Sequence, residues 1–357
     1  MIAQIPRCSM SIDLAVKRFQ TQVLNSVEER TVSGADIMLV GDIGGTHARF
    51  ATVDVSARAP WRLEHRQDFE IELPTFEDAL RRYMQRSGLA SVPAAATVAV
   101  AGPVSAGQAR LTNRDWLISE QALRSFGCGA ALLINDFVAL AFAVDTLGAA
   151  DLRTLGPELK GLDDESISIL GAGTGFGVSC LARYRDRIVP MATEGGHIGF
   201  APDDEQEIAV LRQLSQRFGH VSVERILSGP GLEGLYQALE HVSGRPGASL
   251  SAAQVVANAG NGDAGCTAAL TMFCGVFGSV AGDFALAHGA RGGVYIAGGI
   301  AQKIEGFLAH SDFRSRFERK GRLSDYVKAI PTRLILSGDA ALLGAARAGV
   351  NLHAAPG

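Results

Sequence analysis

Hydrophobic positions along the chain fall in short runs rich in Val, Ile, Leu and Ala, which glycine-containing polar turns separate. Runs that are apolar almost throughout are typical of strands buried on both faces of a sheet. Apolar stretches near residues 75–83 and 137–144 have the pattern of helices. The alternation of the two predicts an α/β protein with mainly buried sheets. Predicted strands lie at 95–101, 131–134 and 293–297.

One arrangement of strands occurs twice. A strand at 37–40 leads through the turn 41–46 into a strand at 48–55, and the same order of strand, glycine-rich turn and strand recurs over 166–183. A chain of 357 residues also exceeds the size of one typical core. We therefore expect two similar halves with a cleft between them.

Residues 1–35 lack the pattern of strands and glycine turns that begins at residue 37, and they are predicted to be an N-terminal extension. Apolar residues recur there at helical spacing, which predicts one short amphipathic helix. These residues are Ile12, Val16, Phe19 and Val23. The extension has no continuous apolar core of the kind that a secretory signal needs.

The longest apolar stretch, residues 267–290, is broken by several glycines, Asp283 and His288. It is predicted to be a buried helix of the protein core rather than a membrane span. Its stripe of Phe273, Val276, Phe277 and Val280 is assigned to core packing.

Composition narrows the class of protein. The charged fraction is 20% and the net charge is −4, which argues against a nucleic-acid partner because such proteins carry a basic face. The five cysteines are odd in number and form no CxxC pair, so neither a disulfide framework nor a zinc knuckle is expected. We expect a reducing compartment and a cytoplasmic protein without a membrane partner.

The two glycine-rich turns carry the candidate chemistry. A turn that holds polyphosphate needs backbone N–H groups pointing inward, and glycine permits both positive φ angles and close approach of the backbone. Thr46 and Thr174 add hydroxyl donors. Asp42 suits Mg²⁺, held directly or through water, because that ion takes one or two carboxylates together with phosphate oxygens. A single turn of this kind is equally well a plain hairpin, but the two turns together with the strand–Gly298–Gly299–helix pattern favour a split nucleotide site.

Two common nucleotide motifs are excluded. No lysine follows a glycine, so there is no P-loop. In the second turn the glycines occupy every other position from Gly171 to Gly177, and a strand follows where the dinucleotide-binding fold requires a helix.

At this point the residues resemble a known family. The runs 40–46 and 171–175 resemble the two phosphate motifs of the sugar kinase/actin/Hsp70 superfamily, and 296–300 resembles its adenosine segment. The runs 192–197 and 224–231 are similar to the bacterial glucokinase family, as are Leu111-Thr112-Asn113 and Leu133-Ile134-Asn135-Asp136-Phe137. The similarity covers roughly residues 37 to 350.

The resemblance implies two ribonuclease H-like domains that flank an active-site cleft and close on glucose. It implies a small α/β domain over 36–146, completed by a C-terminal helix in 337–357, and a larger α+β domain over 147–336. It implies ATP and glucose as substrates, and a homodimer.

The family pattern also assigns site residues. Asp136 falls on the catalytic base, and the sugar-binding positions fall on Asn135, Asp136, Glu194, His197, Glu224 and, with less support, Asn113. The nucleotide-binding positions are Asp42, Gly44, Gly45, Thr46, Gly173, Thr174, Gly175, Gly298 and Gly299.

Each predicted sugar-binding residue, considered on its own, also has a purely structural interpretation. Asp136 is equally well an N-cap of the helix expected from Phe137. In this structural interpretation Glu194 and His197 are ordinary turn residues, and Glu224 forms an exposed charge pair with the neighbouring Arg225. Asn113 is a turn-stabilising residue in the same way. Their joint match to one motif set favours the functional interpretation for Asp136, Glu194, His197 and Glu224, whereas both interpretations of Asn113 stay open.

Our hypothesis is that Asp136, placed directly after a buried strand, accepts the proton of the sugar 6-hydroxyl as that oxygen attacks the γ-phosphoryl group of ATP. The related repressor/kinase group carries a cysteine-rich zinc motif, but no cysteine lies between Cys180 and Cys266 here, so structural zinc is not expected. Two alternatives remain open: a kinase for another hexose such as mannose or fructose, and a non-catalytic sugar sensor of the same fold.

Overall fold

The computed structural model describes residues 37–45, 47–56, 59, 61–70, 73–111, 115–184, 187–245 and 248–353. The predicted extension with its amphipathic helix, as well as Thr46 and Asn113, lies outside the described residues.

The first sheet has five strands in the order β3-β2-β1-β4-β7. The first three form an antiparallel meander, and β1, β4 and β7 run parallel. Their bounds are β1 (Ile37–Ile43), β2 (His47–Asp54), β3 (Glu64–Glu70), β4 (Ala95–Val100) and β7 (Ala130–Asn135). A separate ribbon pairs β5 (Gln108–Arg110) with β6 (Leu117–Ser119).

The second sheet repeats this plan and adds one strand, in the order β11-β10-β9-β12-β13-β8. Again three antiparallel strands are followed by parallel ones, and β8 joins the far edge antiparallel. The bounds are β8 (Leu152–Thr154), β9 (Ile167–Ala172), β10 (Phe176–Tyr184), β11 (Arg187–Thr193), β12 (Gly293–Ala297) and β13 (Thr332–Ile335). The repeated hairpin and the α/β class predicted from the sequence are confirmed.

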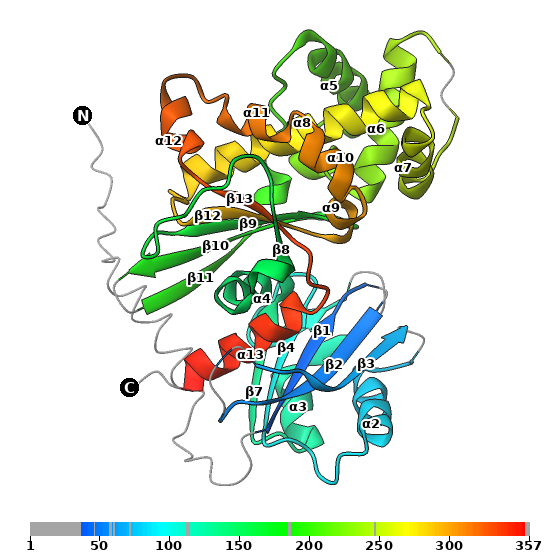
Figure 1. Cartoon of the computed structure of the whole chain (residues 1–357). Coiled ribbons are helices and arrows are strands. Elements are labelled where there is room, and N and C mark those ends of the chain that lie inside the picture. The colour runs from blue at the N-terminus through cyan, green and yellow to red at the C-terminus, as the bar shows by residue number, and fades with distance from the viewer. Residues whose placement is uncertain are drawn as a thin grey trace, which may run out of the picture.

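Most helices cover the second sheet on its outer side (Figure 1). These are α5 (Glu205–Phe218), α6 (Gly229–Val242), α7 (Ala252–Gly260), α8 (Ala264–Ala287), α9 (Gly299–Lys303), α10 (Glu305–His310), α11 (Phe313–Glu318) and α12 (Ser324–Lys328). The first sheet carries α2 (Phe76–Ser87) and α3 (Glu120–Phe126). Short 3₁₀ turns are η1 (Val144–Thr146), η2 (Ala149–Asp151), η3 (Gly195–His197), η4 (Val223–Arg225) and η5 (Gly321–Leu323).

Helix α8 is the apolar segment that the sequence singles out. It has the length and hydropathy of a membrane span, with 67% of its most apolar window buried inside the protein. It packs against α6, α7 and α11. Phe273 and Phe277 are completely buried, and Phe277 stacks edge-on against Phe313 of α11. The predicted buried core helix is confirmed.

Two helices, α4 (Asp136–Ala143) and α13 (Ala340–His353), lie between the two sheets (Figure 1). They pack against each other, α13 also contacts β1 and β4 of the first sheet, and α4 also contacts β9 and β10 of the second. One hydrophobic cluster joins them to Ala99 of the first sheet and Ile169 and Leu181 of the second. The chain therefore returns to the first sheet at its C-terminal end, while the domain bounds 36–146, 147–336 and 337–357 stay a prediction.

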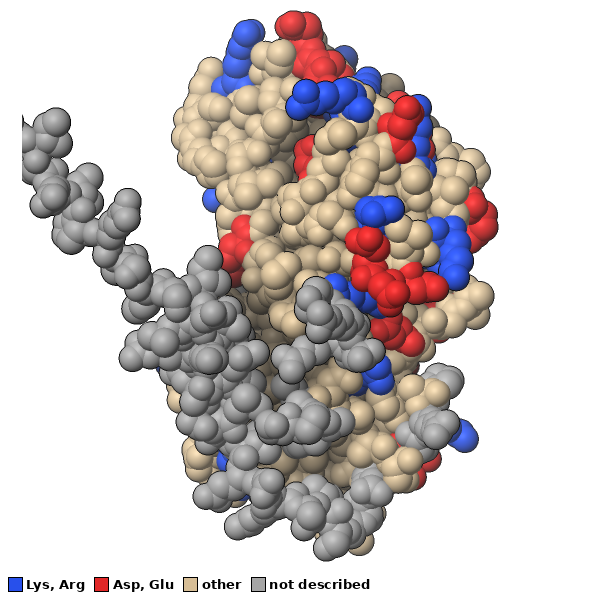
Figure 2. Space-filling model, turned by 90° about the vertical axis from the view of Figure 1, so that its left-hand side faces the viewer, with Lys and Arg blue, Asp and Glu red and all other residues tan. Residues whose placement is uncertain are grey.

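Charge is distributed without strong segregation on one face of the molecule. Figure 2 shows blue and red side chains interspersed over the described part of that face, with tan residues between them. The chain as a whole carries a net charge of −4.

Close contact between α4 and α13 depends on Gly344. A Cβ atom there would lie 1.8 Å from the carbonyl oxygen of Ala139. We expect Gly344→Ala to lower the free energy of unfolding by about 1–3 kcal/mol, because the clash outweighs the helix preference of alanine. Gly306→Ala in α10 is the matched control, since its Cβ would meet no atom within 4 Å. Urea unfolding of both variants measures the difference, and equal midpoints would contradict the packing described.

Candidate active site

Asn135 and Asp136 lie at the junction of β7 and α4. The Oδ1 atom of Asn135 accepts hydrogen bonds from the backbone N–H groups of Phe137 and Val138, at 2.9 and 3.3 Å. Asn135 is therefore the N-cap, and the interpretation of Asp136 as the cap is wrong. The helix begins at Asp136, one residue earlier than expected, which moves the capping position back to Asn135.

The amide of Asn135 also holds Asp136. Its Nδ2 atom donates to Oδ1 of Asp136 at 2.9 Å and to the carbonyl oxygen of Gly102 at 3.1 Å. The pKa of Asp136 is raised to about 7. Burial is the largest cause and the nearby charge of Asp42 adds to it, while hydrogen bonds from the backbone and from Asn135 oppose both effects. A carboxyl group with such a pKa is suited to exchange protons at neutral pH.

Asp42 comes from β1 beside the first glycine turn. Its Oδ2 atom lies 3.1 Å from Nη1 of Arg49, which also donates to the carbonyl oxygen of Gly338 at 3.0 Å. Burial raises the pKa of Asp42, while the positive charge of Arg49 opposes this. The hairpin register pairs Asp42 directly with Arg49 across β1 and β2.

The first glycine turn is a tight hairpin. The N–H group of Gly44 donates to the carbonyl oxygen of His47 at 2.9 Å, and Gly45 lies at the bend. Gly44, Gly173 and Gly175 are not among the residues with positive φ, so the expectation of left-handed backbone is wrong for them. Gly298 does have a positive φ, of 92°.

Close approach explains the glycines of the second turn instead. A Cβ atom on Gly175 would lie 2.5 Å from Oε2 of Glu224, and one on Gly177 would lie 2.0 Å from the ring of Phe137. The turn itself is closed by the bond from the Gly173 N–H group to the carbonyl oxygen of Gly175, at 2.8 Å. Any side chain at Gly175 or Gly177 would push apart the neighbouring segments.

Three further segments meet the second turn. Glu224 accepts a hydrogen bond from the N–H group of Phe176 at 2.8 Å, and the N–H group of Gly229, at the start of α6, donates to the carbonyl oxygen of Gly173 at 2.8 Å. A Cβ atom on Gly298 would lie 2.3 Å from the carbonyl oxygen of Ala172. The residues predicted for phosphate, sugar and adenosine thus converge here.

The segment Glu194–His197 also rests on this turn. A Cβ atom on Gly196 would lie 2.1 Å from the carbonyl oxygen of Phe176, so the backbones touch. The side chains of Glu194 and His197 are 74% and 62% exposed, with 3.9 Å between Oε2 and Nε2. Both side chains are exposed enough to meet a ligand, and the separation between them is too long for a hydrogen bond.

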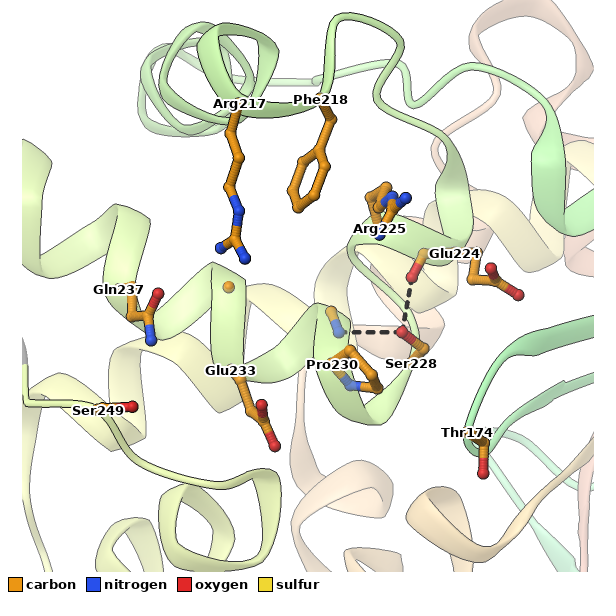
Figure 3. A pocket seen from close by; sticks show the side chains of 12 residues that line it. Thr174, Arg217, Phe218, Glu224, Arg225, Ser228, Pro230, Glu233, Gln237 and Ser249 are labelled. Atoms are coloured by element: carbon orange, nitrogen blue, oxygen red, sulfur yellow. Dashed lines mark hydrogen bonds between the residues drawn. The ribbon is translucent and has the colours of Figure 1, made fainter. Parts of the chain in front are cut away.

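A cavity of about 370 Å³ opens beside the second turn (Figure 3). Thr174 and Glu224 line one side, and the start of α6, capped by Ser228, forms its wall. The other lining residues are Arg217, Phe218, Arg225, Pro230, Gly231, Glu233, Gly234, Gln237 and Ser249. The cavity is therefore lined both by Thr174, which is predicted to bind phosphate, and by Glu224, which is predicted to bind the sugar.

Phe137 links the two walls of the site. It follows Asp136 on α4, and its ring lies against Gly171 and Gly177 on either side of the second turn. The charge of Asp42 acts on Asp136 from the side of the first turn. Asp136 is therefore near enough to Asp42 of the first turn to feel its charge, and it directly precedes the ring that packs on the second turn.

A family model described as Glucokinase matches residues 39–352. The chain belongs to the glucokinase family. A glucokinase of Caulobacter sp. strain K31 is 49% identical over 309 residues, which cover 86% of this chain and 93% of that protein. The glucokinase of an Antarctic psychrotroph has a crystal structure that matches with a TM-score of 0.81 and 35% identity, covering 89% of this chain and all of the other.

More distant members of the fold match as well. The ROK family glucokinase from Streptomyces griseus, solved with glucose and AMPPNP, has a TM-score of 0.58 at 19% identity and covers 89% of this chain and all of that one. At that identity the likeness shows the fold alone. The two-domain glucokinase fold expected from the sequence is confirmed.

Three residues of the site carried no role in the sequence-based interpretation: Arg49, Phe137 and His220. Arg49 could have been found by pairing the two strands of the predicted hairpin, which places it opposite Asp42. The sequence pattern assigns Phe137 only to an apolar helix. His220, whose Nε2 atom lies 3.1 Å from the carbonyl oxygen of His197, lies in a loop with no recognisable pattern.

Asn135 combines two tasks that substitution can separate. Asn135→Ser keeps a capping oxygen, whereas Asn135→Ala loses both the cap and the donor to Asp136. Because the donor stabilises the charged carboxylate, both variants should raise the pKa of Asp136 and move the acid limb of the pH–turnover profile to higher pH.

Only the Ala variant should also lose about 1 kcal/mol of stability. Thermal unfolding and pH profiles of purified protein measure the two effects. An acid limb that stays at the wild-type pH in both variants would show that Asn135 does not act on Asp136.

Proposed function

We propose that the protein is a glucokinase that transfers the γ-phosphoryl group of ATP to the 6-hydroxyl of glucose, giving glucose 6-phosphate and ADP. The observation that supports the mechanism is the setting of Asp136: its pKa is raised to about 7, it is affected by the charge of Asp42 beside the first turn, and it precedes the Phe137 ring that packs on the second turn. The 49% identity to the Caulobacter glucokinase supports the choice of substrates.

Asp136 acts as the general base in this proposal. Near pH 7 a large share of the protein carries it as carboxylate, ready to take the proton of the 6-hydroxyl as that oxygen attacks phosphorus. Phosphoryl transfer passes through a loose transition state, so most of the catalysis comes from positioning and charge neutralisation, and the base adds roughly 10²–10⁴-fold.

The sugar contacts fall on Glu194, His197 and Glu224, with Asn113 as a further candidate outside the described residues. Glu194 and His197 are exposed, and Glu224 uses one oxygen on Phe176, which leaves the other for a hydroxyl. Asn135 has both amide hydrogens and its oxygen engaged within the protein. Its contribution in this conformation is to support Asp136, and contact with glucose would require one of these bonds to open.

The ATP phosphates lie, in this proposal, along Gly44, Gly45 and Thr46 on one side and Gly173, Thr174 and Gly175 on the other, with Gly298 and Gly299 at the nucleoside. Mg²⁺ would be held by Asp42, directly or through water. The described residues offer no cluster of three metal-ligating side chains, and Mg²⁺ bound mainly by phosphate oxygens needs only one or two carboxylates. When bound, the ion neutralises charge on the transferring phosphoryl group.

We further propose that the protein is a cytoplasmic homodimer that supplies glucose 6-phosphate to glycolysis. The cysteines that the structure describes are all free and buried, which suits a reducing compartment. Light scattering on the purified protein measures the oligomeric state.

Replacement of the base tests the mechanism. Asp136→Asn should lower kcat about 10²- to 10⁴-fold because no group then accepts the proton, while glucose still binds. ADP release gives kcat, and calorimetry gives glucose affinity. Asp325→Asn, whose wild-type side chain is 98% exposed, is the control that should behave as wild type. Wild-type turnover in Asp136→Asn would show that Asp136 is not the general base.

The substrate assignment is tested by ADP release with glucose, mannose and fructose, each with and without Mg²⁺. We expect the highest kcat/KM with glucose and a strict requirement for Mg²⁺. A higher kcat/KM with another hexose would make the protein a kinase for that sugar. Sugar binding without turnover of any hexose would make it a sensor.

A further inference from the structure

The segment that carries Glu194 and His197 is fastened to the loop before Glu224. Two of the bonds join backbone groups: the N–H group of Val223 donates to the carbonyl oxygen of Ile198, and that of Phe200 donates to the carbonyl oxygen of Val221, each at 2.9 Å. Bonds between backbone groups do not depend on which side chains are present, because almost every residue has the same donor and acceptor.

The third bond comes from a side chain. Nε2 of His220 lies 3.1 Å from the carbonyl oxygen of His197, the last residue of the 3₁₀ turn η3. The carbonyl oxygen can only accept, so Nε2 carries the hydrogen and donates. This bond acts on the backbone of a residue whose side chain is mostly exposed.

The backbone around His220 suits this role. Gly219 ends α5 with a φ of +67°, which turns the chain sharply before His220. The ring then lies over Gly199, because a Cβ atom on Gly199 would be 3.8 Å from Cε1 of His220. The His220 ring therefore lies beside the chain at Gly199 and is also hydrogen-bonded to His197 of the sugar-binding segment Glu194–His197.

The side chains of His197 and Glu194 do not fix each other's orientation. Their side chains are mostly exposed, and the distance of 3.9 Å between them is too long for a hydrogen bond. The direction of the His197 side chain therefore depends mainly on the backbone of its own turn. Fixing the carbonyl group of that residue limits how far the turn can rotate.

We propose that His220 is a positioning residue for the sugar-binding segment: by donating to the His197 carbonyl it holds Glu194 and His197 ready for glucose. This inference rests on the proposed function of the site. The contacts that place His220 are with His197 and Gly199, so we expect its effect to fall on sugar binding rather than on ATP binding or the chemical step.

The test compares His220→Ala, which removes the donor, with His220→Gln, whose side-chain amide keeps an N–H group near the position of Nε2. His310→Ala is the matched control. His310 also makes a ring-to-carbonyl bond, from Nδ1 to Gly306 at 2.7 Å, but this bond lies within α10.

We expect His220→Ala to raise KM for glucose, and the calorimetric Kd for glucose without ATP, by about three- to tenfold, as the loss of one hydrogen bond of ordinary net strength does. KM for ATP and kcat should stay within about twofold of wild type. His220→Gln should recover most of the glucose affinity, and His310→Ala should match wild type throughout.

The outcomes separate this inference from the proposed function. If wild type phosphorylates glucose and His220→Ala keeps its glucose KM and Kd, His220 has no positioning role although the function stands. If His220→Ala lowers kcat and raises both KM values alike, or if His220→Gln restores nothing, the role is structural and the proposal is wrong. If wild type has no turnover, the proposed function fails, while glucose Kd still tests His220.

Discussion

The packing of α4 between the two sheets is the constraint on which the site depends. Val138 and Phe142 of this helix join a core shared with Ile169 of the second sheet, while Asn135 fixes the first turn of the helix to the end of β7. Asp136 is the first residue of α4, so the helix cannot shift without moving the carboxyl group. The same packing partly shields the carboxyl group from water, and this desolvation raises its pKa.

That arrangement lowers stability at neutral pH. The pKa of Asp136 is raised from an ordinary value of 3.8 to about 7 in the folded protein, so between these values the folded protein holds a proton that the unfolded chain releases. The free energy of unfolding therefore falls as pH rises through this window. A strained or costly group of this kind is expected where function requires it.

The second glycine turn connects the other parts of the site. Glu224, α6, the Glu194–His197 segment and Gly298 all contact it through backbone atoms or through space that a side chain would fill. Each of these segments is therefore positioned by its contact with this one turn. This explains how a sugar contact and a phosphate contact can be held in fixed relation although their residues lie far apart in the sequence.

Local sequence patterns predict much of this fold. The repeated hairpin, the buried helix α8 and the position of Asp136 after a buried strand all follow from apolar runs and the turns that end them, and the structure agrees with each. The sequence pattern puts the N-cap at Asp136, one residue too late, because the pattern alone does not fix where a strand ends and a helix begins. The glycine turns were expected to need positive φ, but Gly175 and Gly177 are required by neighbours from other segments, which no local pattern reveals. The bond between His220 and His197 likewise depends on how two loops meet.

The most direct test of this account is the titration of the Asp136 carboxyl group itself in the free protein. Carbon-13 NMR of protein labelled at the aspartate carboxyl carbons, with Asp136→Asn to assign the signal, follows that one group. Burial between the lobes predicts a midpoint at about pH 7, well above that of the exposed aspartates. A midpoint near 4 would mean that the carboxyl group is solvated, and the account of a buried base between the two turns would be wrong.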